Sequence, residues 1–114
     1  MKGNITDKIR VLHILEAINE VEAYIVGVNY PDFVANSEKR FATIKQIEII
    51  GEACNHITAH LKEKHPEIEW KSIKGFRNIS IHEYFGINFQ IIWEIAKYDL
   101  PILKQQFIEI SQMI

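Results

Sequence analysis

The sequence is poor in the features that mark secreted and membrane proteins. It has a single cysteine, Cys54, so no disulfide can form within the chain, and a reducing compartment is expected. No apolar run reaches the roughly 20 residues of a membrane span. The opening residues, MKGNITDKIR, also lack the apolar segment of a secretory signal. We therefore expect a cytoplasmic protein without membrane contact, with Cys54 as a small buried residue.

The chain also lacks a strong excess of either charge. Thirteen lysines and arginines against fifteen aspartates and glutamates give a formal net charge of −2. Overall charge therefore offers no support for nucleic-acid binding, and any such site must be local. Hydrophobic residues make up 47% of the 114 positions and charged residues 25%, which is typical of one globular domain spanning residues 1–114.

Strand-like alternation, internal repeats and low-complexity tracts are absent from the sequence, and apolar residues instead recur at steps of three and four. This periodicity predicts an all-α protein, an antiparallel helical bundle. A first helix is expected after a cap at Thr6, with Asp7 near its N-terminus. Its buried stripe comprises Val11, Ile14, Leu15, Ile18, Val21, Ile25 and Val28.

Proline, glycine and capping residues predict where the other helices begin and end. A loop is expected over residues 27–36, and a second helix from a cap at Ser37 or Asn36 to Pro66. The predicted buried side of that helix is Phe41, Ile44, Ile47, Gly51, Cys54, Ile57 and Leu61. A third helix is expected from about Trp70 to Tyr84. A fourth is expected after Asn88, with Ile91, Ile92, Ile95 and Tyr98 on its apolar side and a kink at Pro101.

The segment GFRNISIHEYFG, residues 75–86, places polar side chains that could take part in catalysis among large apolar ones. On an ideal helix Trp70, Ile73, Arg77 and Tyr84 share one stripe. Arg77 therefore needs a carboxylate, a backbone carbonyl, a partner chain or an anionic ligand. Arg77 and His82 are about 140° apart on the same helix, so helix geometry alone does not pair them. A purely structural role, with a glutamate holding Arg77 and His82 bonded in the core, stays open.

The residues RNISIHEY spell Arg-x4-His-x-Tyr, which resembles the signature of the HepT-like toxins of the HEPN ribonuclease superfamily. LHILEAI, IEIIGEA, HPEIEWKSIKGFRN and EYFGIN…IIWEI…DLPIL resemble the same family in order and spacing. The resemblance covers nearly the whole chain. It implies one HEPN domain with a bundle of four or five helices, which agrees with the periodicity.

The resemblance implies an endoribonuclease that works without a metal or other cofactor, by activating a ribose 2′-hydroxyl against the adjacent phosphate. His82 suits the proton transfer, because imidazole titrates near neutral pH. Arg77 suits the phosphate, because its planar guanidinium can bind two oxygens at once. Asn78 could orient the phosphate or His82. Glu83 departs from the family pattern and could alter His82 or repel RNA.

Tyr84 resembles the tyrosine to which a minimal nucleotidyltransferase antitoxin transfers AMP. The added phosphate would block the anion site and compete for Arg77. The alternative for Tyr84 is simple packing at a helix end. For the whole chain, the alternative is a catalytically silent HEPN-like module that binds a nucleotidyltransferase or a nucleotide.

Three further expectations concern metals, RNA and oligomeric state. Glu48, Glu52, His56 and His60 recur at steps of four, a pattern better explained by a solvated or interface-lining face than by a metal site. A basic region ahead of the motif could contact an RNA backbone; it comprises Lys62, Lys64, Lys71, Lys74 and Arg77. We also expect a homodimer whose cleft is lined by Trp70, Ile73 and Glu83, because tryptophan, tyrosine and arginine are enriched at interfaces.

Overall fold

The structure of the chain, a computed structural model, describes residues 2–79 and 89–114. Every regular element in these ranges is helical, which confirms the predicted all-α class. The elements are α1 (Lys2–Ile25), α2 (Tyr30–Ala35), α3 (Ser37–Asn55), α4 (Ala59–Lys64), α5 (Trp70–Lys74), the 3₁₀ turn η1 (Gly75–Asn78), α7 (Phe89–Glu94), the π-helical turn η2 (Ile95–Asp99) and α8 (Leu100–Ser111).

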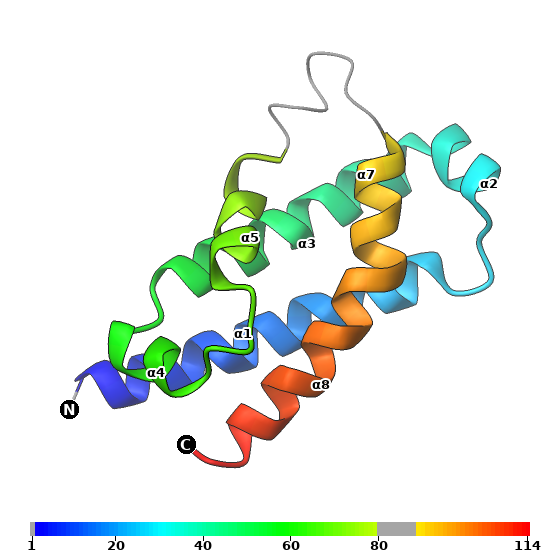
Figure 1. Cartoon of the computed structure of the whole chain (residues 1–114). Coiled ribbons are helices and arrows are strands. Elements are labelled where there is room, and N and C mark those ends of the chain that lie inside the picture. Colours follow the sequence, from blue (N-terminus) through cyan, green and yellow to red (C-terminus); the bar gives the residue numbers. More distant parts are fainter. Residues whose placement is uncertain (1, 80–88) are drawn as a thin grey trace.

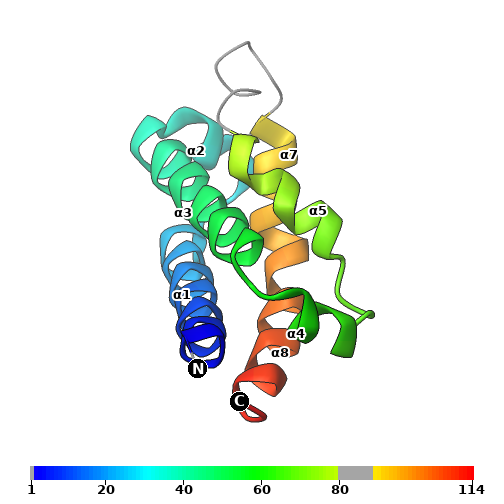
Figure 2. The same ribbon diagram turned by 90° about the vertical axis from the view of Figure 1, so that its left-hand side faces the viewer.

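The long helices α1 and α3 pack side by side in opposite directions, and α8 packs against α1 (Figure 1). Figure 2 shows α1 and α3 on one side of the bundle and α5, α7 and α8 on the other. The buried stripe predicted for the first helix faces the shared core, and its central members are fully buried: Val11, Ile14, Ile18 and Val21. None of the described helices has the length and apolarity needed to cross a membrane.

Asp7 was expected near the N-terminus of the first helix, but in the structure it lies within α1 and binds Thr58. Helix α1 begins at Lys2, so the predicted cap at Thr6 is wrong. Asp7 is 7% exposed, and its two carboxylate oxygens accept hydrogen bonds from the Thr58 backbone N–H (2.9 Å) and the Thr58 hydroxyl (2.6 Å). The Thr58 hydroxyl in turn caps α4 by accepting from the Leu61 N–H. Asp7 thus fixes the corner between α3 and α4.

The predicted loop between the first two helices contains the short helix α2. Gly27, with φ of 71°, follows the end of α1 in the left-handed conformation that favours glycine. Asn29 caps α2 through a bond from the Asp32 N–H, and Pro31 occupies its first turn. Phe33 is fully buried and anchors α2 to the core. The prediction of a loop over the whole of residues 27–36 was therefore wrong.

The second predicted helix is two helices. The Asn36 side chain caps α3 by accepting a hydrogen bond from the Lys39 N–H, which confirms one of the two predicted caps. Helix α3 ends at Asn55 and α4 starts afresh after Thr58, so a continuous helix to Pro66 was wrong. Phe41 is 56% exposed and does not lie on the buried side predicted for it.

The final helical segments, α7, η2 and α8, follow one another directly along the chain. The Leu100 N–H donates to the Ile95 carbonyl five residues earlier, and this wider turn precedes Pro101. A widened turn accommodates the proline ring and its missing N–H, as a π bulge does. Ile92 and Ile95 are buried as predicted, whereas Ile91 and Tyr98 are exposed, which corrects that part of the stripe. The predicted cap at Asn88 lies outside the described residues.

Candidate active site

The segment that begins the motif packs backbone to backbone on α3 at Gly51. A Cβ atom at position 51 would lie 2.6 Å from the Arg77 backbone nitrogen and 2.9 Å from the Phe76 carbonyl carbon, closer than side chains tolerate. Gly51 therefore permits η1 to approach α3 directly. This contact brings Arg77 against the C-terminal half of α3.

The motif segment departs from the uniform α-helix expected over Trp70–Tyr84. The α-helix ends at Lys74, and residues Gly75–Asn78 form a 3₁₀ turn, in which successive side chains are about 120° apart. Ile73 is 1% exposed in the core, and Trp70 packs edge-on against Phe107 while its Nε1–H donates to the His65 carbonyl (2.8 Å). The side chains of Ile73 and Trp70 therefore both pack within the chain. A cleft-lining role for them stays a prediction.

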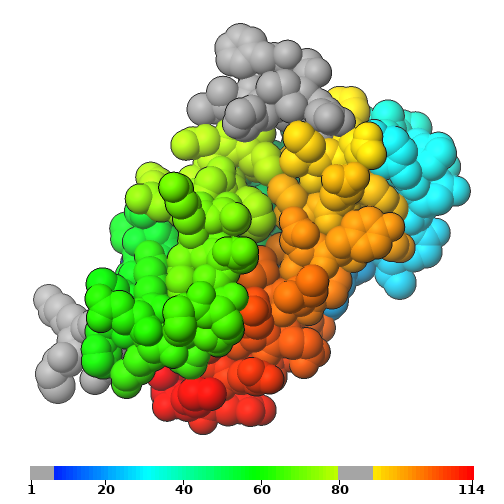
Figure 3. All heavy atoms as spheres, viewed as in Figure 1, coloured from blue at the N-terminus to red at the C-terminus, as the bar shows by residue number. Residues whose placement is uncertain are grey.

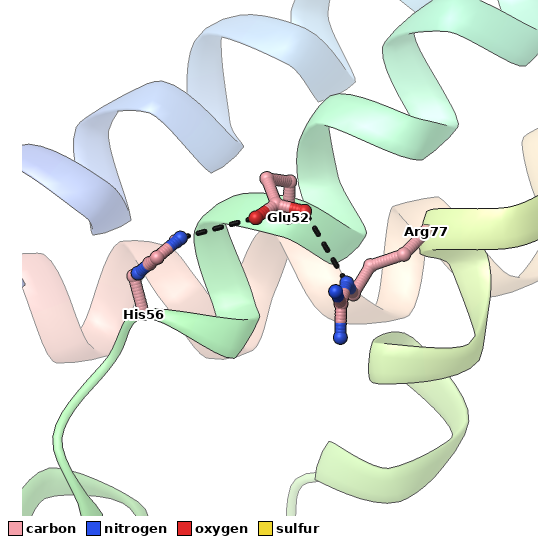
Figure 4. Close-up of polar contacts among 3 residues, drawn as sticks. All are labelled: Glu52, His56 and Arg77. Atoms are coloured by element: carbon pink, nitrogen blue, oxygen red, sulfur yellow. Dashed lines mark hydrogen bonds and ion pairs between the residues drawn. The ribbon is translucent and has the colours of Figure 1, made fainter.

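Arg77 has a defined partner, the carboxylate of Glu52 on α3. The Arg77 Nε–H donates to Glu52 Oε2 at 3.2 Å, and the His56 Nε2–H donates to Glu52 Oε1 at 3.0 Å (Figure 4). One carboxylate thus bridges a guanidinium and an imidazole. All three side chains reach solvent, with exposed fractions of 34% for Arg77, 48% for His56 and 54% for Glu52.

The electrostatics of this group follow from its hydrogen bonds. The bond from His56 is the main cause that lowers the pKa of Glu52; partial burial opposes it, and the charge and hydrogen bond of Arg77 lower the pKa further. Glu52 is therefore ionised at neutral pH and can only accept hydrogen bonds. His56 must then carry hydrogen on Nε2, which leaves Nδ1 as its second functional atom.

The guanidinium of Arg77 retains binding capacity. Its Nε is engaged with Glu52, and within residues 7–79 and 89–114 neither terminal amino group has a hydrogen-bond partner. The edge formed by those two amino groups is the one that binds a carboxylate or phosphate through two parallel bonds. Glu52 thus orients Arg77 without occupying this edge.

Comparison with known proteins shows to which family the chain belongs. The model of the family described as Ribonuclease HepT-like matches residues 14–110. The chain belongs to the HepT-like ribonuclease family. This confirms the family expected from the motif and places the chain among RNA endonucleases.

Two HepT-like relatives illustrate the extent of the match. A protein of Methanocaldococcus jannaschii named "Putative RNase MJ1380" is 42% identical over 93 residues, which covers 82% of this chain and 85% of that protein. A protein of Thermococcus cleftensis named "Probable ribonuclease HepT" is 38% identical over 94 residues, covering 82% of this chain and 86% of that protein. No solved structure matches the chain.

The structure describes part of the predicted HepT-like site. Arg77 and the exposed Asn78 lie together in η1, which ends the described part of the motif. His82, Glu83 and Tyr84 lie outside the described residues. The group that accompanies Arg77 was instead treated, from sequence, as part of a solvated or interface-lining face. The signal that could have found it is the i,i+4 spacing of Glu52 and His56 directly after Gly51.

The predicted line of four polar residues is not one continuous face. Glu52 and His56 pair on α3, whereas His60 belongs to the separate helix α4. Among the residues that the structure describes, no cluster of three metal-binding side chains occurs. The Glu52 carboxylate is instead engaged by Arg77 and His56.

A groove of about 350 Å³ lies on another face, between α5 with η1 and α8; Figure 3 shows the surface hollowed between these segments. Its floor is apolar, with Ile73, Phe76 and Leu103, and acidic residues contribute to its lining: Glu67, Glu69 and Asp99. Burial, followed by the charge of Glu94, raises the pKa of Asp99. This acidic lining disfavours an RNA backbone, so the groove is a poorer phosphate site than Arg77.

Proposed function

We propose that this HepT-like protein is the toxin of a toxin–antitoxin pair and cleaves RNA without a metal ion. In this proposal Arg77 binds the scissile phosphate and His82 transfers a proton. The observation that carries it is the Arg77 guanidinium, which Glu52 holds through Nε without occupying the two-pronged edge. The family membership of the chain supports the same activity.

In the proposed reaction one phosphorus–oxygen bond forms and another breaks. The ribose 2′-oxygen loses its proton to a base and attacks phosphorus, while the bond from phosphorus to the 5′-oxygen breaks. The products are a 2′,3′-cyclic phosphate and a 5′-hydroxyl. Arg77 stabilises the negative charge that builds on the phosphate oxygens, and His82 supplies proton transfer. Asn78, next to Arg77, would orient the phosphate or His82.

The test is cleavage of RNA by the purified protein in the presence of EDTA. Wild-type protein should cleave under these conditions and should inhibit growth when expressed alone. His82→Ala should remove cleavage while the helical circular-dichroism signal is retained. His13→Ala, which changes an exposed histidine on α1, is the matched control and should cleave normally. Undiminished cleavage by His82→Ala would refute the mechanism.

We further propose that a partner nucleotidyltransferase silences the toxin by AMP transfer. The Tyr84 phenol oxygen would attack the α-phosphate of ATP and release pyrophosphate. The resemblance of the motif carries this step, and the phosphate it adds is the kind of group that competes for an arginine. We also propose a homodimer that brings the Arg77 and His82 of two copies into shared sites, as the HEPN resemblance implies.

One observation favours the second candidate, a catalytically silent module that binds a nucleotidyltransferase or a nucleotide. The Glu52 carboxylate offsets the charge of Arg77, as expected for an arginine satisfied inside its own fold. The two candidates differ in one measurement. A silent module would leave RNA intact in the EDTA assay, yet would still bind its partner or nucleotide.

A further inference from the structure

We propose that the groove between α5 with η1 and α8 is a docking surface, and that it binds a basic amphipathic helix of a partner protein. The proposal goes beyond the proposed function, because docking at this groove requires no cleavage of RNA. Three properties of the groove carry it: an apolar floor that continues into exposed apolar side chains, a rim of carboxylates, and walls formed by helical segments.

The floor of the groove continues outward into exposed apolar surface. Ile73, Phe76 and Leu103 form the floor, and Ile102, which also lines the groove, is 63% exposed. Tyr98, about one helical turn before Ile102, is 62% exposed. Single exposed apolar residues are common on soluble proteins. Apolar residues grouped at a groove and rimmed by polar ones instead mark a surface that binds another molecule.

The rim of the groove is acidic, and two of its carboxylates are not used within the fold. Glu67 lies 3.5 Å from His65. The carboxylates of Glu69 and Asp99, in contrast, have no hydrogen-bond or ion-pair partner within residues 7–79 and 89–114. Each of these two residues directly precedes a helix, yet neither side chain makes a capping bond. Helix capping therefore does not explain the two carboxylates at the groove.

The charge of the rim determines the kind of partner. Burial, followed by the charge of Glu94, raises the pKa of Asp99, and a cation beside Asp99 would offset the repulsion from Glu94. The phosphates of RNA or of an anionic membrane would add to this repulsion. A second copy that met this groove with its own groove would bring like charges together. The rim is therefore complementary to lysine or arginine side chains of a different protein.

The shape of the groove fits a helix. Its walls are α5 with η1 on one side and α8 on the other, and Figure 3 shows the surface hollowed between them. A helix laid in such a groove inserts apolar residues spaced three or four apart. Lysine or arginine residues beside them would pair with Glu69 before α5 and Asp99 before α8. Because Phe76 lines the groove and directly precedes Arg77, the docked helix would lie against the segment that carries Arg77.

The test measures the binding of two labelled synthetic peptides to the full chain by fluorescence anisotropy. Both peptides are helices of about 15 residues with leucine along one face. One peptide carries lysine on the other face, and its twin carries glutamate at the same positions. The lysine peptide should bind saturably with a Kd on the order of 10 μM, as expected for a small interface. The glutamate peptide should bind at least about tenfold more weakly.

Matched variants locate the binding site of the lysine peptide. Removing both unused charges, by Glu69→Gln together with Asp99→Asn, should weaken its binding about tenfold. Glu16→Gln together with Glu38→Gln changes the net charge by the same amount at exposed positions of α1 and α3. This control pair should bind the peptide like wild type.

The apolar contact is tested in the same way. Ile102→Asn should weaken binding of the lysine peptide about tenfold, because asparagine removes apolar area from the interface. Val26→Asn is the control, since it changes an apolar residue that is 77% exposed and lies outside the groove. It should bind the peptide like wild type. Circular dichroism of each variant confirms that folded proteins are compared.

The proposal is overturned if the lysine peptide shows no saturable binding, or if the two peptides bind equally well. Equal weakening by the groove variants and their controls would also overturn it. A lower mass of Ile102→Asn than of wild type in light scattering would show that a second copy covers the groove instead. Because none of these measurements uses RNA, failure of the proposed ribonuclease function would leave this test unaffected, and failure of docking would leave cleavage unaffected.

Discussion

Gly51 and Arg77 are in direct backbone contact, so closely that a single added carbon on Gly51 would lie 2.6 Å from the Arg77 nitrogen. This contact sets the position of the candidate site, because it places η1 on α3 next to Glu52. The arginine reaches the carboxylate from this position, and the carboxylate then holds His56. A residue without a side chain thus determines where three functional side chains meet.

Replacing Gly51 by alanine should disturb both stability and cleavage. The added methyl group meets backbone atoms, which cannot rotate away, so we expect a loss of about 1–3 kcal/mol in the free energy of unfolding. Arg77 should shift from Glu52, and RNA cleavage should fall. Urea unfolding and the cleavage assay measure the two effects. Gly75→Ala is the control, because a Cβ there has no atom within 4 Å. Equal stability of the two variants would contradict the argument.

Glu52 should titrate below its ordinary pKa of 4.5 in the folded protein. Because its folded pKa is lowered, its contribution to stability is fully present above pH 4.5 and is lost as the pH falls through the lowered value. Carboxyl carbon NMR of selectively labelled protein gives the midpoint. His56→Ala should move it back toward 4.5, because the bond from His56 is the largest single cause, and Arg77→Ala should move it in the same direction. An unchanged midpoint in His56→Ala would exclude that cause.

Cys54 should react with thiol reagents only when the protein unfolds. Burial raises the pKa of its thiol to about 11, against the opposing charge of Lys62. The reactive thiolate is therefore about one part in a thousand at pH 8. Labelling with a disulfide reagent should be slow in buffer and fast in urea. Lys74→Cys, at an exposed position, provides the control and should label at once in the folded protein. Rapid labelling of native wild type would show that Cys54 is accessible.

Incubation with the cognate nucleotidyltransferase and ATP should add one or more AMP units to Tyr84 and stop RNA cleavage. The reason is that the added phosphate competes for Arg77. Intact-protein mass spectrometry measures the modification, and the cleavage assay measures its effect. Tyr84→Phe should gain no mass and stay active, whereas Tyr98→Phe, which changes an exposed tyrosine, should be modified like wild type. An equal gain of mass by Tyr84→Phe would refute the assignment.

Two inactive variants should restore activity to each other if the site is shared between two copies. Light scattering should report about twice the 13.3 kDa chain mass. Arg77→Ala and His82→Ala, unfolded and refolded together, should recover about a quarter of wild-type cleavage, because half the dimers are mixed and each has one complete site. Each variant refolded alone is the control. No recovery from a dimeric mixture would place Arg77 and His82 of one site in the same chain.

The helical class and the centres of the long helices could be predicted because their apolar periodicity extends over many turns. Val11, Ile14, Ile18 and Val21 all face the core as predicted. The helix boundaries were harder to predict, because tertiary contacts determine where a helix begins and ends. Thr58 caps α4 while bonded to Asp7, and that bond depends on how the folded bundle brings α1 to this corner. Local patterns around Thr58 therefore could not show that α3 ends before it.

The need of Arg77 for a partner could also be predicted, and a carboxylate was among the partners considered. The identity of this partner could not be predicted, because Glu52 lies 25 residues before Arg77 in the sequence. The two side chains meet only because η1 packs on Gly51. The change from α-helix to 3₁₀ turn at Gly75 could not be predicted from the sequence for a related reason. Contact with α3, rather than the local sequence pattern alone, sets the direction of that segment.

The hydrogen bonds between Asp7 and Thr58 join the beginning of the chain to the turn beside His56, 51 positions later. Loss of the Asp7 carboxylate would leave the Thr58 N–H and hydroxyl without their acceptor and loosen the corner on which His56 stands. A change at position 7 would thus act on the candidate site without touching the motif.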